Sequence, residues 1–273
     1  YLDEDIGPFD LGECDNAVIS SEIVIKHTLP LGHQKMVMCG GVFVKELFEE
    51  LTCSTLLLAE EGEIVEPGRV IVQVIGKASD VLNGERVALN ILARCMGIAG
   101  KTKLIVDHAR DRGWKGVIAG TRKTTPGFRL CEKYAVYMGG GDPHRYGLHD
   151  MCMIKDNHLD IHSHDHQSYV MHVKQGLSFT TKLEVEVSSL ELALAAAEQG
   201  TDIVMFDNVT PSDAKEWSDV VKSRHPNILL EVSGGITMDN IDEYLHDNID
   251  IVSMGALTQQ CPLVDLSMRI ILE

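Results

Sequence analysis

Hydrophobic and polar positions follow two different rhythms along the chain, and the rhythm changes near residue 85. Before that point, short strand-like runs surround one stretch with helical spacing, residues 42–51. The strand-like runs are residues 18–19, 22–26, 36–39 and 69–75. From residue 78 to about residue 112, apolar residues recur at helical intervals, with a break at Gly97 and Gly100. This pattern predicts an α+β region followed by a helical segment.

Beyond residue 112, short apolar runs end in polar or glycine-rich residues, and helical stretches separate the later runs. The six runs are residues 116–119, 151–154, 183–186, 202–206, 228–232 and 250–252. This repetition predicts parallel strands joined by crossover helices. A complete eight-unit barrel needs at least ~200 residues, whereas these six units occupy about 160. We therefore predict an α/β protein with an incomplete βα barrel of six or seven strands; an open doubly wound sheet is the alternative.

The same patterns predict two domains. An α+β N-terminal domain is expected over residues 1–97, and residues 262–273 are a candidate for returning to it. The βα-barrel domain is expected over residues 98–261. Active groups of parallel α/β folds gather at the carboxyl ends of the strands, where most charged residues of these runs lie.

Composition and charge narrow the classes of partner. The chain has 273 residues, 44% of them hydrophobic, and a formal net charge of −17. That charge argues against nucleic-acid binding and against an anionic membrane surface, and no apolar run approaches the ~18 residues of a membrane span. The seven cysteines form no C-x-x-C pair, which favours free thiols and a reducing, cytoplasmic compartment.

One segment is basic although the chain is acidic. Residues 122–155 carry six basic and three acidic side chains. Such an island is typical either of a pocket for a small anion or of an ordinary solvated surface. Arg122, Lys123, Arg145 and Lys155 all lie near predicted strand ends, and four cations at one mouth favour a polyanionic substrate.

Glycine and acidic residues end the later strands. Ser233-Gly234-Gly235 is predicted to open into a helix, and the next run ends in Ser253-Met254-Gly255. Exposed backbone N–H groups and a helix N-terminus at such ends would hold a phosphate. Glu186 and Asp207 end two neighbouring strands, where they would serve Mg²⁺ or sugar hydroxyls, or alternatively form salt bridges. Glu184 and Glu186 are two apart and so point the same way.

A histidine-rich loop is the remaining candidate for metal chemistry. It comprises His162, His164, Asp165, His166 and His172. Its irregular flanks favour a solvated loop over a metal site.

Taken together and in this order, the motifs resemble the quinolinate phosphoribosyltransferase family, in a eukaryotic-like form. The resemblance covers residues 78 to 260, and its most specific part is Gly120–Gly127. The other matching segments are 84–99, 128–134, 144–146, 155–158, 183–186, 207–208 and 233–236.

The resemblance implies the substrates quinolinate and phosphoribosyl pyrophosphate with Mg²⁺ as cofactor, and the products nicotinate mononucleotide, pyrophosphate and CO₂. The residues it implies for the dianion and the pyrophosphate are Arg122, Lys123, Thr124, His144, Arg145 and Lys155. It implies Glu186 and Asp207 for the ribose hydroxyls and Mg²⁺, and residues 233–235 and 253–255 for the 5′-phosphate. Lys123, Lys155, Glu186 and Asp207 are the expected catalytic group.

The resemblance also implies a homo-oligomer, a dimer or a hexamer built of dimers, in which Arg86 completes the neighbour's site. Two other functions remain open on sequence grounds. One is a related phosphoribosyltransferase that acts on nicotinate, and the other is a relative that binds a phosphorylated metabolite without turnover.

Overall fold

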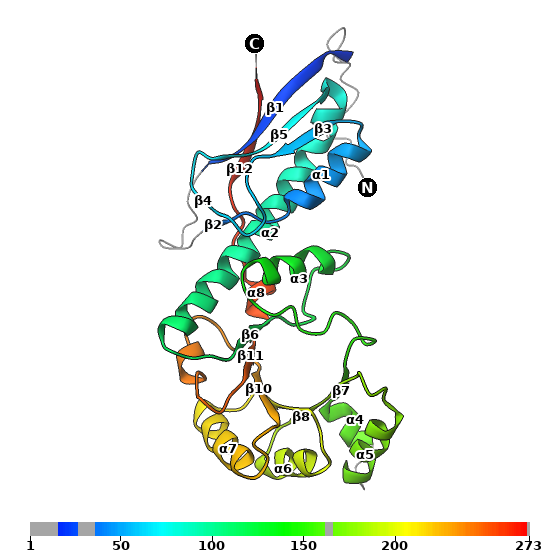
Figure 1. The fold of residues 1–273 in the computed structure, drawn as a ribbon, viewed down its shortest axis with the longest axis vertical. Helices are drawn as coiled ribbons and strands as arrows, with labels where there is room; N and C mark the ends of the chain where they lie inside the picture. Colours follow the sequence, from blue (N-terminus) through cyan, green and yellow to red (C-terminus); the bar gives the residue numbers. More distant parts are fainter. Residues whose placement is uncertain (1–15, 27–35, 162–165, 272–273) are drawn as a thin grey trace. The chain divides into compact units, whose positions relative to one another are not determined.

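The computed structural model describes residues 16–26, 36–161 and 166–271 of the chain (Figure 1). These residues group into two compact units. The first unit takes in residues up to 104, residues 125–140 and residues from 260 onward; the second takes in residues 105–124 and 141–259. The predicted domain boundary at residue 97 stays a prediction.

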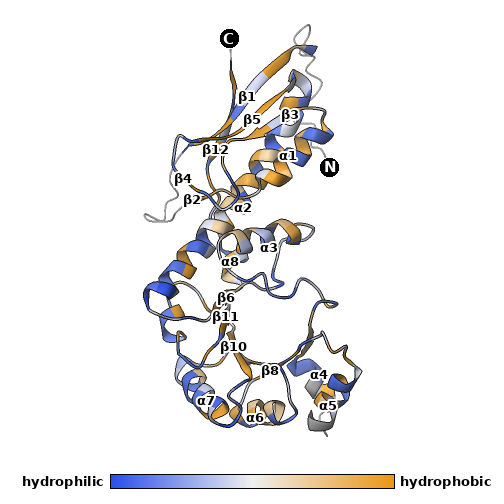
Figure 2. Ribbon diagram, viewed as in Figure 1, coloured by the Kyte–Doolittle hydropathy of each residue, from blue (hydrophilic) through white to orange (hydrophobic). Residues whose placement is uncertain are grey.

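The first unit is built on an antiparallel sheet of four strands in the order β12-β1-β5-β3. The strands are β1 (Val18–Ile25), β3 (Ser54–Leu57), β5 (Val70–Lys77) and β12 (Leu266–Ile271). A two-stranded sheet of β2 (Met36–Val37) and β4 (Ile64–Val65) and helices α1 (Gly41–Glu50) and α3 (Arg129–Met138) complete it. Orange hydrophobic residues are prominent on β1, β5 and α1 in Figure 2, in line with buried Ile23, Val72 and Phe48.

Helix α2 (Ala78–Asp111) is continuous over 34 residues, so the expected break at Gly97 and Gly100 is wrong. A Cβ on Gly97 would lie 1.8 Å from the carbonyl oxygen of Pro262. The missing side chain of Gly97 therefore lets another chain segment approach closely, and Gly97 does not interrupt the helix.

The second unit confirms the incomplete βα barrel. Six parallel strands follow the order β6-β11-β10-β9-β8-β7. They are β6 (Val117–Ala119), β7 (Cys152–Ile154), β8 (Leu183–Val187), β9 (Ile203–Asp207), β10 (Leu229–Ser233) and β11 (Ile251–Ser253). All six correspond to predicted runs. β6 and β7, the first two barrel strands along the chain, form the two edges of this sheet. In a closed barrel the two edge strands would pair with each other, and here they do not.

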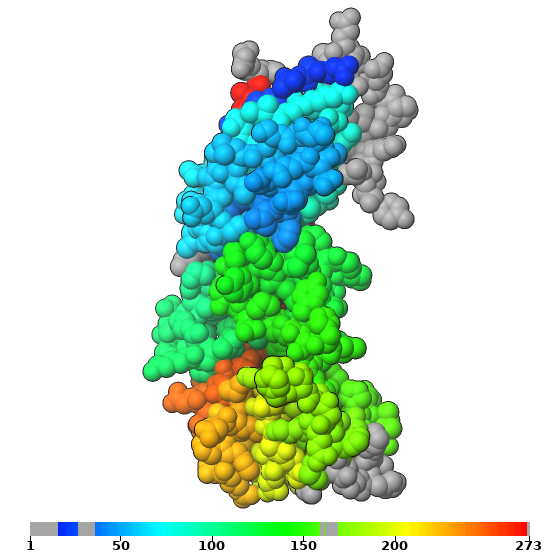
Figure 3. Space-filling view, turned by 45° about the vertical axis from the view of Figure 1, so that its right-hand side comes forward, coloured from blue at the N-terminus to red at the C-terminus, as the bar shows by residue number. Residues whose placement is uncertain are grey.

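Helices follow these strands along the chain, and all but the last of them connect one barrel strand to another. The helices are α4 (Asp156–Ile161), α5 (His166–Gly176), α6 (Leu190–Glu198), α7 (Pro211–Arg224) and α8 (Ala256–Gln259). On the face drawn in Figure 3, their segments follow one another in sequence order from green through yellow to orange. The Ser189 hydroxyl accepts the Leu192 N–H at the start of α6, and Thr210 caps α7 in the same way, each contributing about 1 kcal/mol. None of the described helices has both the length and the apolar composition needed to cross a membrane.

Candidate active site

A cavity of about 280 Å³ opens within the second unit at the carboxyl ends of the barrel strands. Every barrel strand contributes a lining residue at or next to its end. The lining residues are Gly120, Thr121, Arg122, Lys123, His144, Arg145, Met153, Lys155, Glu186, Met205, Asp207, Glu231, Ser233 and Ser253. The site therefore lies where parallel α/β folds place their chemistry.

The cavity gathers most of the residues expected from the sequence. Those that line it are Arg122, Lys123, His144, Arg145, Lys155, Glu186, Asp207, Ser233 and Ser253. Thr124, Gly234, Gly235, Met254 and Gly255 are sequence neighbours of lining residues and do not line the cavity themselves. Arg86 is an exposed residue of α2 in the first unit.

Lys155 and Glu186 form an ion pair across the cavity, in which Lys155 Nζ donates to Glu186 Oε2. Lys155 follows β7, and Glu186 lies next to the end of the neighbouring strand β8. The Lys155 ammonium is about half-exposed whereas the Glu186 carboxylate is buried. Lys155 can therefore exchange this partner for an incoming anion with modest desolvation.

Arg145 is a buried cation, with 8% of its surface exposed. Its guanidinium donates to the Met151 carbonyl oxygen at 3.2 Å and lies 3.1 Å from Met153 Sδ. Burial, and next the charge of Arg122, lower the pKa of the Arg145 guanidinium from its usual value. Because both hydrogen-bond acceptors are neutral, an anionic ligand would relieve this desolvation.

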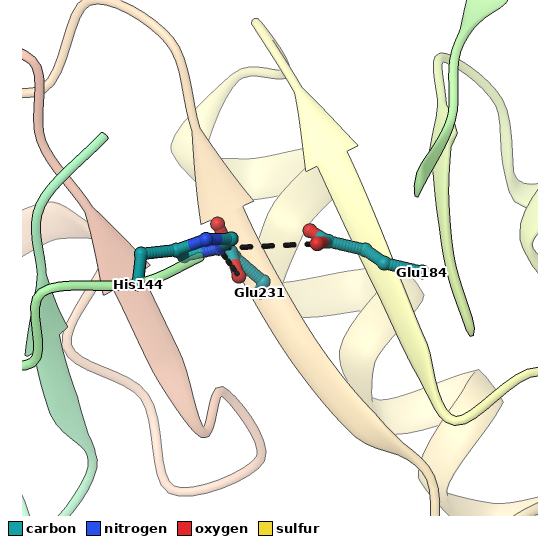
Figure 4. Close-up of side chains that lie close together, drawn as sticks. All are labelled: His144, Glu184 and Glu231. Atoms are coloured by element: carbon teal, nitrogen blue, oxygen red, sulfur yellow. Dashed lines mark hydrogen bonds and ion pairs between the residues drawn. The ribbon is translucent and has the colours of Figure 1, made fainter. Parts of the chain in front are cut away.

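Near Arg145 and Lys155, three side chains form a cluster: His144, Glu184 and Glu231 (Figure 4). His144 Nε2 lies 3.1 Å from Glu231 Oε2 and 3.8 Å from Glu184 Oε2. Both carboxyl groups are fully buried, and three of their four oxygens have no hydrogen-bond partner. Burial, and next the charge of Glu231, raise the pKa of Glu184 to about 9. This shift favours the protonated form of Glu184 at neutral pH.

The lining residues absent from the sequence prediction are Gly120, Thr121, Met153, Met205 and Glu231. Of these, Glu231 had a visible signal. It is an acidic residue inside an apolar run and lies two positions before Ser233, so both side chains point to the same face of β10. Glu184 and Glu186 follow the same alternation on β8. They are expected to point the same way, and both are buried.

Two glycines after β10 take the left-handed backbone that the phosphate hypothesis needs. Gly234 has φ 97° and Gly235 has φ 65°, and a Cβ on Gly234 would lie 2.3 Å from Asn208 Oδ1. The helix expected after them is wrong, because only a short 3₁₀ helix forms at Ile241–Glu243. The Thr237 N–H donates to Asn240 Oδ1, and Asn240 Nδ2 donates to the Gly235 carbonyl oxygen. These side-chain bonds compete with helical ones.

Polar atoms still face the cavity on this side. The buried Ser253 Oγ at the end of β11 has no hydrogen-bond partner, and Ser233 ends β10. A phosphate in this part of the cavity would therefore be held by backbone N–H groups and serine hydroxyls, because the expected helix does not form.

Glu186 and Asp207 present carboxylate oxygens to the same cavity from adjacent strands. Asn208 Nδ2 donates to Asp207 Oδ2 at 2.7 Å and orients that carboxylate. Two hard oxygen ligands beside an open cavity suit Mg²⁺, which keeps several ligand positions for water or substrate oxygens.

Most of the predicted histidine-rich loop lies outside the described part of the chain. His162, His164 and Asp165 lie outside the described residues, as does the side chain of His166. His172 is exposed on α5.

Comparison with known proteins identifies the same family in both parts of the chain. Residues 13–96 match the N-terminal domain of quinolinate phosphoribosyl transferase, and residues 98–269 match its C-terminal domain. The nicotinate-nucleotide pyrophosphorylase [carboxylating] of Rattus norvegicus is 44% identical over 87% of this chain and 79% of its own. The Dictyostelium discoideum protein of the same name is 40% identical over 99% of this chain and 93% of its own.

A solved structure agrees with these matches. The nicotinate-nucleotide pyrophosphorylase of Francisella tularensis superposes with a TM-score of 0.84 at 31% identity, covering 99% of this chain and 93% of its own. An incomplete barrel with a cationic mouth and two matched domains leads to one assignment: the chain belongs to the quinolinate phosphoribosyltransferase family.

Proposed function

We propose that this cavity transfers the phosphoribosyl group of phosphoribosyl pyrophosphate to quinolinate, with loss of CO₂. The products are nicotinate mononucleotide and pyrophosphate, in the synthesis of NAD. The observation that carries the proposal is the meeting of four cations with Glu186 and Asp207 in one cavity. The cations are Arg122, Lys123, Arg145 and Lys155. A dicarboxylate and a phosphorylated sugar that react together need both kinds of side chain, cations for the anionic groups and carboxylates for the sugar.

Quinolinate is assigned to the cationic side of the cavity. Arg145 and Arg122 offer planar guanidinium groups that match carboxylates, and Lys155 adds a compact charge. Two adjacent carboxylates on the ring would satisfy the desolvated Arg145 and draw Lys155 away from Glu186. His144 and Thr124 belong to the same side of the proposal.

Phosphoribosyl pyrophosphate is assigned to the opposite side. The 5′-phosphate would take residues 233–235 and 253–255, where Ser253 Oγ lacks a partner. The ribose hydroxyls would take Glu186 and Asp207, and Lys123 would meet the pyrophosphate.

Bond cleavage at the ribose C1 develops positive charge on the sugar and negative charge on the departing pyrophosphate. Glu186 and Asp207 stabilise the sugar cation, whereas Lys123 stabilises the leaving group. The pyridine nitrogen attacks with its own lone pair, so no general base is needed. The resulting cationic ring accepts the electron pair released as the adjacent carboxylate leaves as CO₂, and a proton from solvent takes its place.

Mg²⁺ is part of the proposal, with Glu186 and Asp207 as the residues that would hold it. When bound, the ion neutralises charge on pyrophosphate oxygens. The chain's own residues then position the two substrates so that C1 and the ring nitrogen meet.

Residues 1–97 and 98–261 are proposed as the two functional domains, and the active form as a homo-oligomer in which Arg86 enters the neighbour's cavity. The described cysteines are free thiols, which is consistent with the reducing cytoplasm as its location.

Paired incubations test the proposed function. The protein, Mg²⁺ and phosphoribosyl pyrophosphate are incubated with quinolinate or with nicotinate, and pyrophosphate release is followed. The proposal predicts release with quinolinate and little with nicotinate, which has one carboxylate for the same set of cations. Release with nicotinate alone would assign the nicotinate reaction, and release with neither would favour a binding protein without turnover.

A further inference from the structure

We propose that Glu231 is a positioning residue for Arg145, acting through His144. Glu231 holds the imidazole of His144, and His144 in turn fixes the backbone from which the Arg145 guanidinium enters the cavity. The inference rests on the proposed function, because it takes Arg145 as a ligand of the pyridine dicarboxylate. No motif pointed to Glu231, and it touches no substrate in this scheme.

The segment that carries His144 and Arg145 is fastened to strand β6. The Asp142 N–H donates to the Ile118 carbonyl oxygen, and the Gly120 N–H donates to the Asp142 carbonyl oxygen, both at 2.8 Å. His144 then turns the chain with φ 57°, a left-handed conformation that residues other than glycine rarely adopt. Its N–H donates to Asp142 Oδ1 at 2.6 Å. Such a conformation persists only where its surroundings hold it.

The hydrogen bonds of the ring fix its tautomer. The backbone N–H of Arg145 donates to His144 Nδ1 at 2.8 Å, so Nδ1 carries the lone pair. The proton of the neutral imidazole is then on Nε2, which lies 3.1 Å from Glu231 Oε2. Figure 4 shows the ring beside Glu231 and facing Glu184, with a dashed contact to each. His144 is thus a donor to Glu231 and an acceptor from Arg145.

The same geometry argues against a metal ion in this cluster. The ligand atoms of His144, Glu184 and Glu231 lie within 4.8 Å of one another, which is a suitable spacing for a cation. A metal on Nε2 needs a lone pair there, however, and a neutral imidazole has only one, which Nδ1 uses toward the Arg145 N–H. The cluster therefore serves as a hydrogen-bonded support.

His144 positions the Arg145 guanidinium through the backbone that joins the two residues. Arg145 follows His144 directly, and its buried side chain has few other anchors, the Met151 carbonyl oxygen and Met153 Sδ. If His144 loses Glu231, the left-handed turn relaxes and the guanidinium moves out of line with the ligand carboxylate. The loss should thus appear in binding of the dicarboxylate and spare the sugar phosphate.

Four variants test this chain of contacts. Glu231→Leu removes the acceptor, Glu231→Gln keeps an acceptor oxygen, and His144→Asn removes the ring while tolerating a left-handed backbone. Asp202→Ala is the matched control: its carboxylate accepts the Leu183 N–H at 2.8 Å at the start of β8, away from the cavity lining. Quinolinate binding is measured by calorimetry, and KM for each substrate by product formation.

We expect Glu231→Leu and His144→Asn each to weaken quinolinate binding by about tenfold, and to change the KM for phosphoribosyl pyrophosphate by less than about twofold. The double variant should be no worse than either single one, since both break the same path. Glu231→Gln should restore most of the affinity. Multiplying losses in the double variant, or a Glu231→Gln variant as weak as Glu231→Leu, would overturn the proposal.

The tautomer gives a readout that an unspecific loss of stability would not move. In protein with ¹⁵N-labelled histidine, the signal missing from His144→Asn should show a proton on Nε2 and none on Nδ1. A proton on Nδ1 would overturn the inference. Calorimetry also separates the two proposals: a wild-type protein that binds quinolinate but makes no mononucleotide fails the proposed function, whereas an active wild type with unchanged binding in Glu231→Leu fails the positioning role.

Discussion

Lys155 and Arg145 offer the same charge to the cavity from different environments. Lys155 is half-exposed and already paired with Glu186, whereas Arg145 is buried among neutral acceptors. A ligand gains from Arg145 by relieving desolvation and from Lys155 by replacing a partner. Truncating either should remove one charge-assisted contact.

For Lys155→Ala we expect quinolinate binding to weaken by on the order of 1.5–3 kcal/mol, with a much smaller effect on the sugar phosphate. Calorimetry with each ligand checks this, with the exposed Lys215→Ala on α7 as control. Equal losses for both ligands would mean that the dicarboxylate side of the cavity is misassigned.

Glu184 makes stability depend on pH in a definite direction. Its pKa rises from 4.5 to about 9 on folding, so between these values the folded protein holds a proton that the unfolded chain releases. The free energy of unfolding therefore falls as pH rises through this window, by at most about 1.4 kcal/mol per pH unit. Below pH 4.5 both states are protonated and the full contribution is present.

Glu184→Gln should remove this dependence. In urea unfolding between about pH 5 and pH 8, its stability should decline less steeply with pH than that of the wild type. Parallel curves for the two proteins would show that Glu184 is ionised in the folded state.

Among the structural elements, the six barrel strands were the ones most completely predicted from the sequence. Buried parallel strands such as β9 need near-continuous apolar runs, and the polar residue that ends each run marks the active edge. Strands β3 and β12 were not predicted; both are edge strands of the antiparallel sheet, and most of their side chains are partly or fully exposed. The helix expected after Gly235 failed because Asn240 side-chain bonds hold the turn instead.

Residues of the candidate site could be predicted from the sequence where they lie at the ends of strands. Lys155, Glu186 and Asp207 are strand-end charges and were all found. Glu231 lies inside a strand, and its hydrogen-bond partner His144 is 87 positions away in sequence. The alternation along β10 marks Glu231 as facing inward, but its pairing with His144 has no local signal in the sequence.

Helix α2 yields a prediction about glycine. Gly97→Ala should favour the helix by propensity, but its Cβ would lie 1.8 Å from the Pro262 carbonyl oxygen. We expect a net destabilisation of about 1–3 kcal/mol by overpacking. Gly176→Ala in α5, where a Cβ meets open space, is the control and should be neutral or stabilising. Thermal unfolding of both variants decides this, and equal behaviour would contradict the close contact.

At the scale of the whole molecule, Arg86 is the test of assembly. It belongs to the first unit, whereas the cavity is lined entirely by residues of the second. If Arg86 serves a neighbour's cavity, then Arg86→Ala and Arg122→Ala, each inactive alone, should complement each other after subunit exchange. Half of the dimers would be hybrids, and each hybrid would have one intact site, so about a quarter of wild-type activity should return.

Verified exchange without recovery would contradict the shared site and the need for an oligomer. A mixture of each variant with itself, treated in the same way, supplies the baseline. Subunit exchange is followed independently by a mass tag on one of the two variants.

Following the 2-carboxyl group of quinolinate tests the decarboxylating transfer reaction itself. Quinolinate carrying ¹³C in its 2-carboxyl group is incubated with the protein, phosphoribosyl pyrophosphate and Mg²⁺, and the products are analysed by mass. We expect unlabelled nicotinate mononucleotide and one equivalent of labelled CO₂ for each pyrophosphate released. A product that keeps the label, or labelled quinolinate recovered intact with no pyrophosphate released, would contradict it.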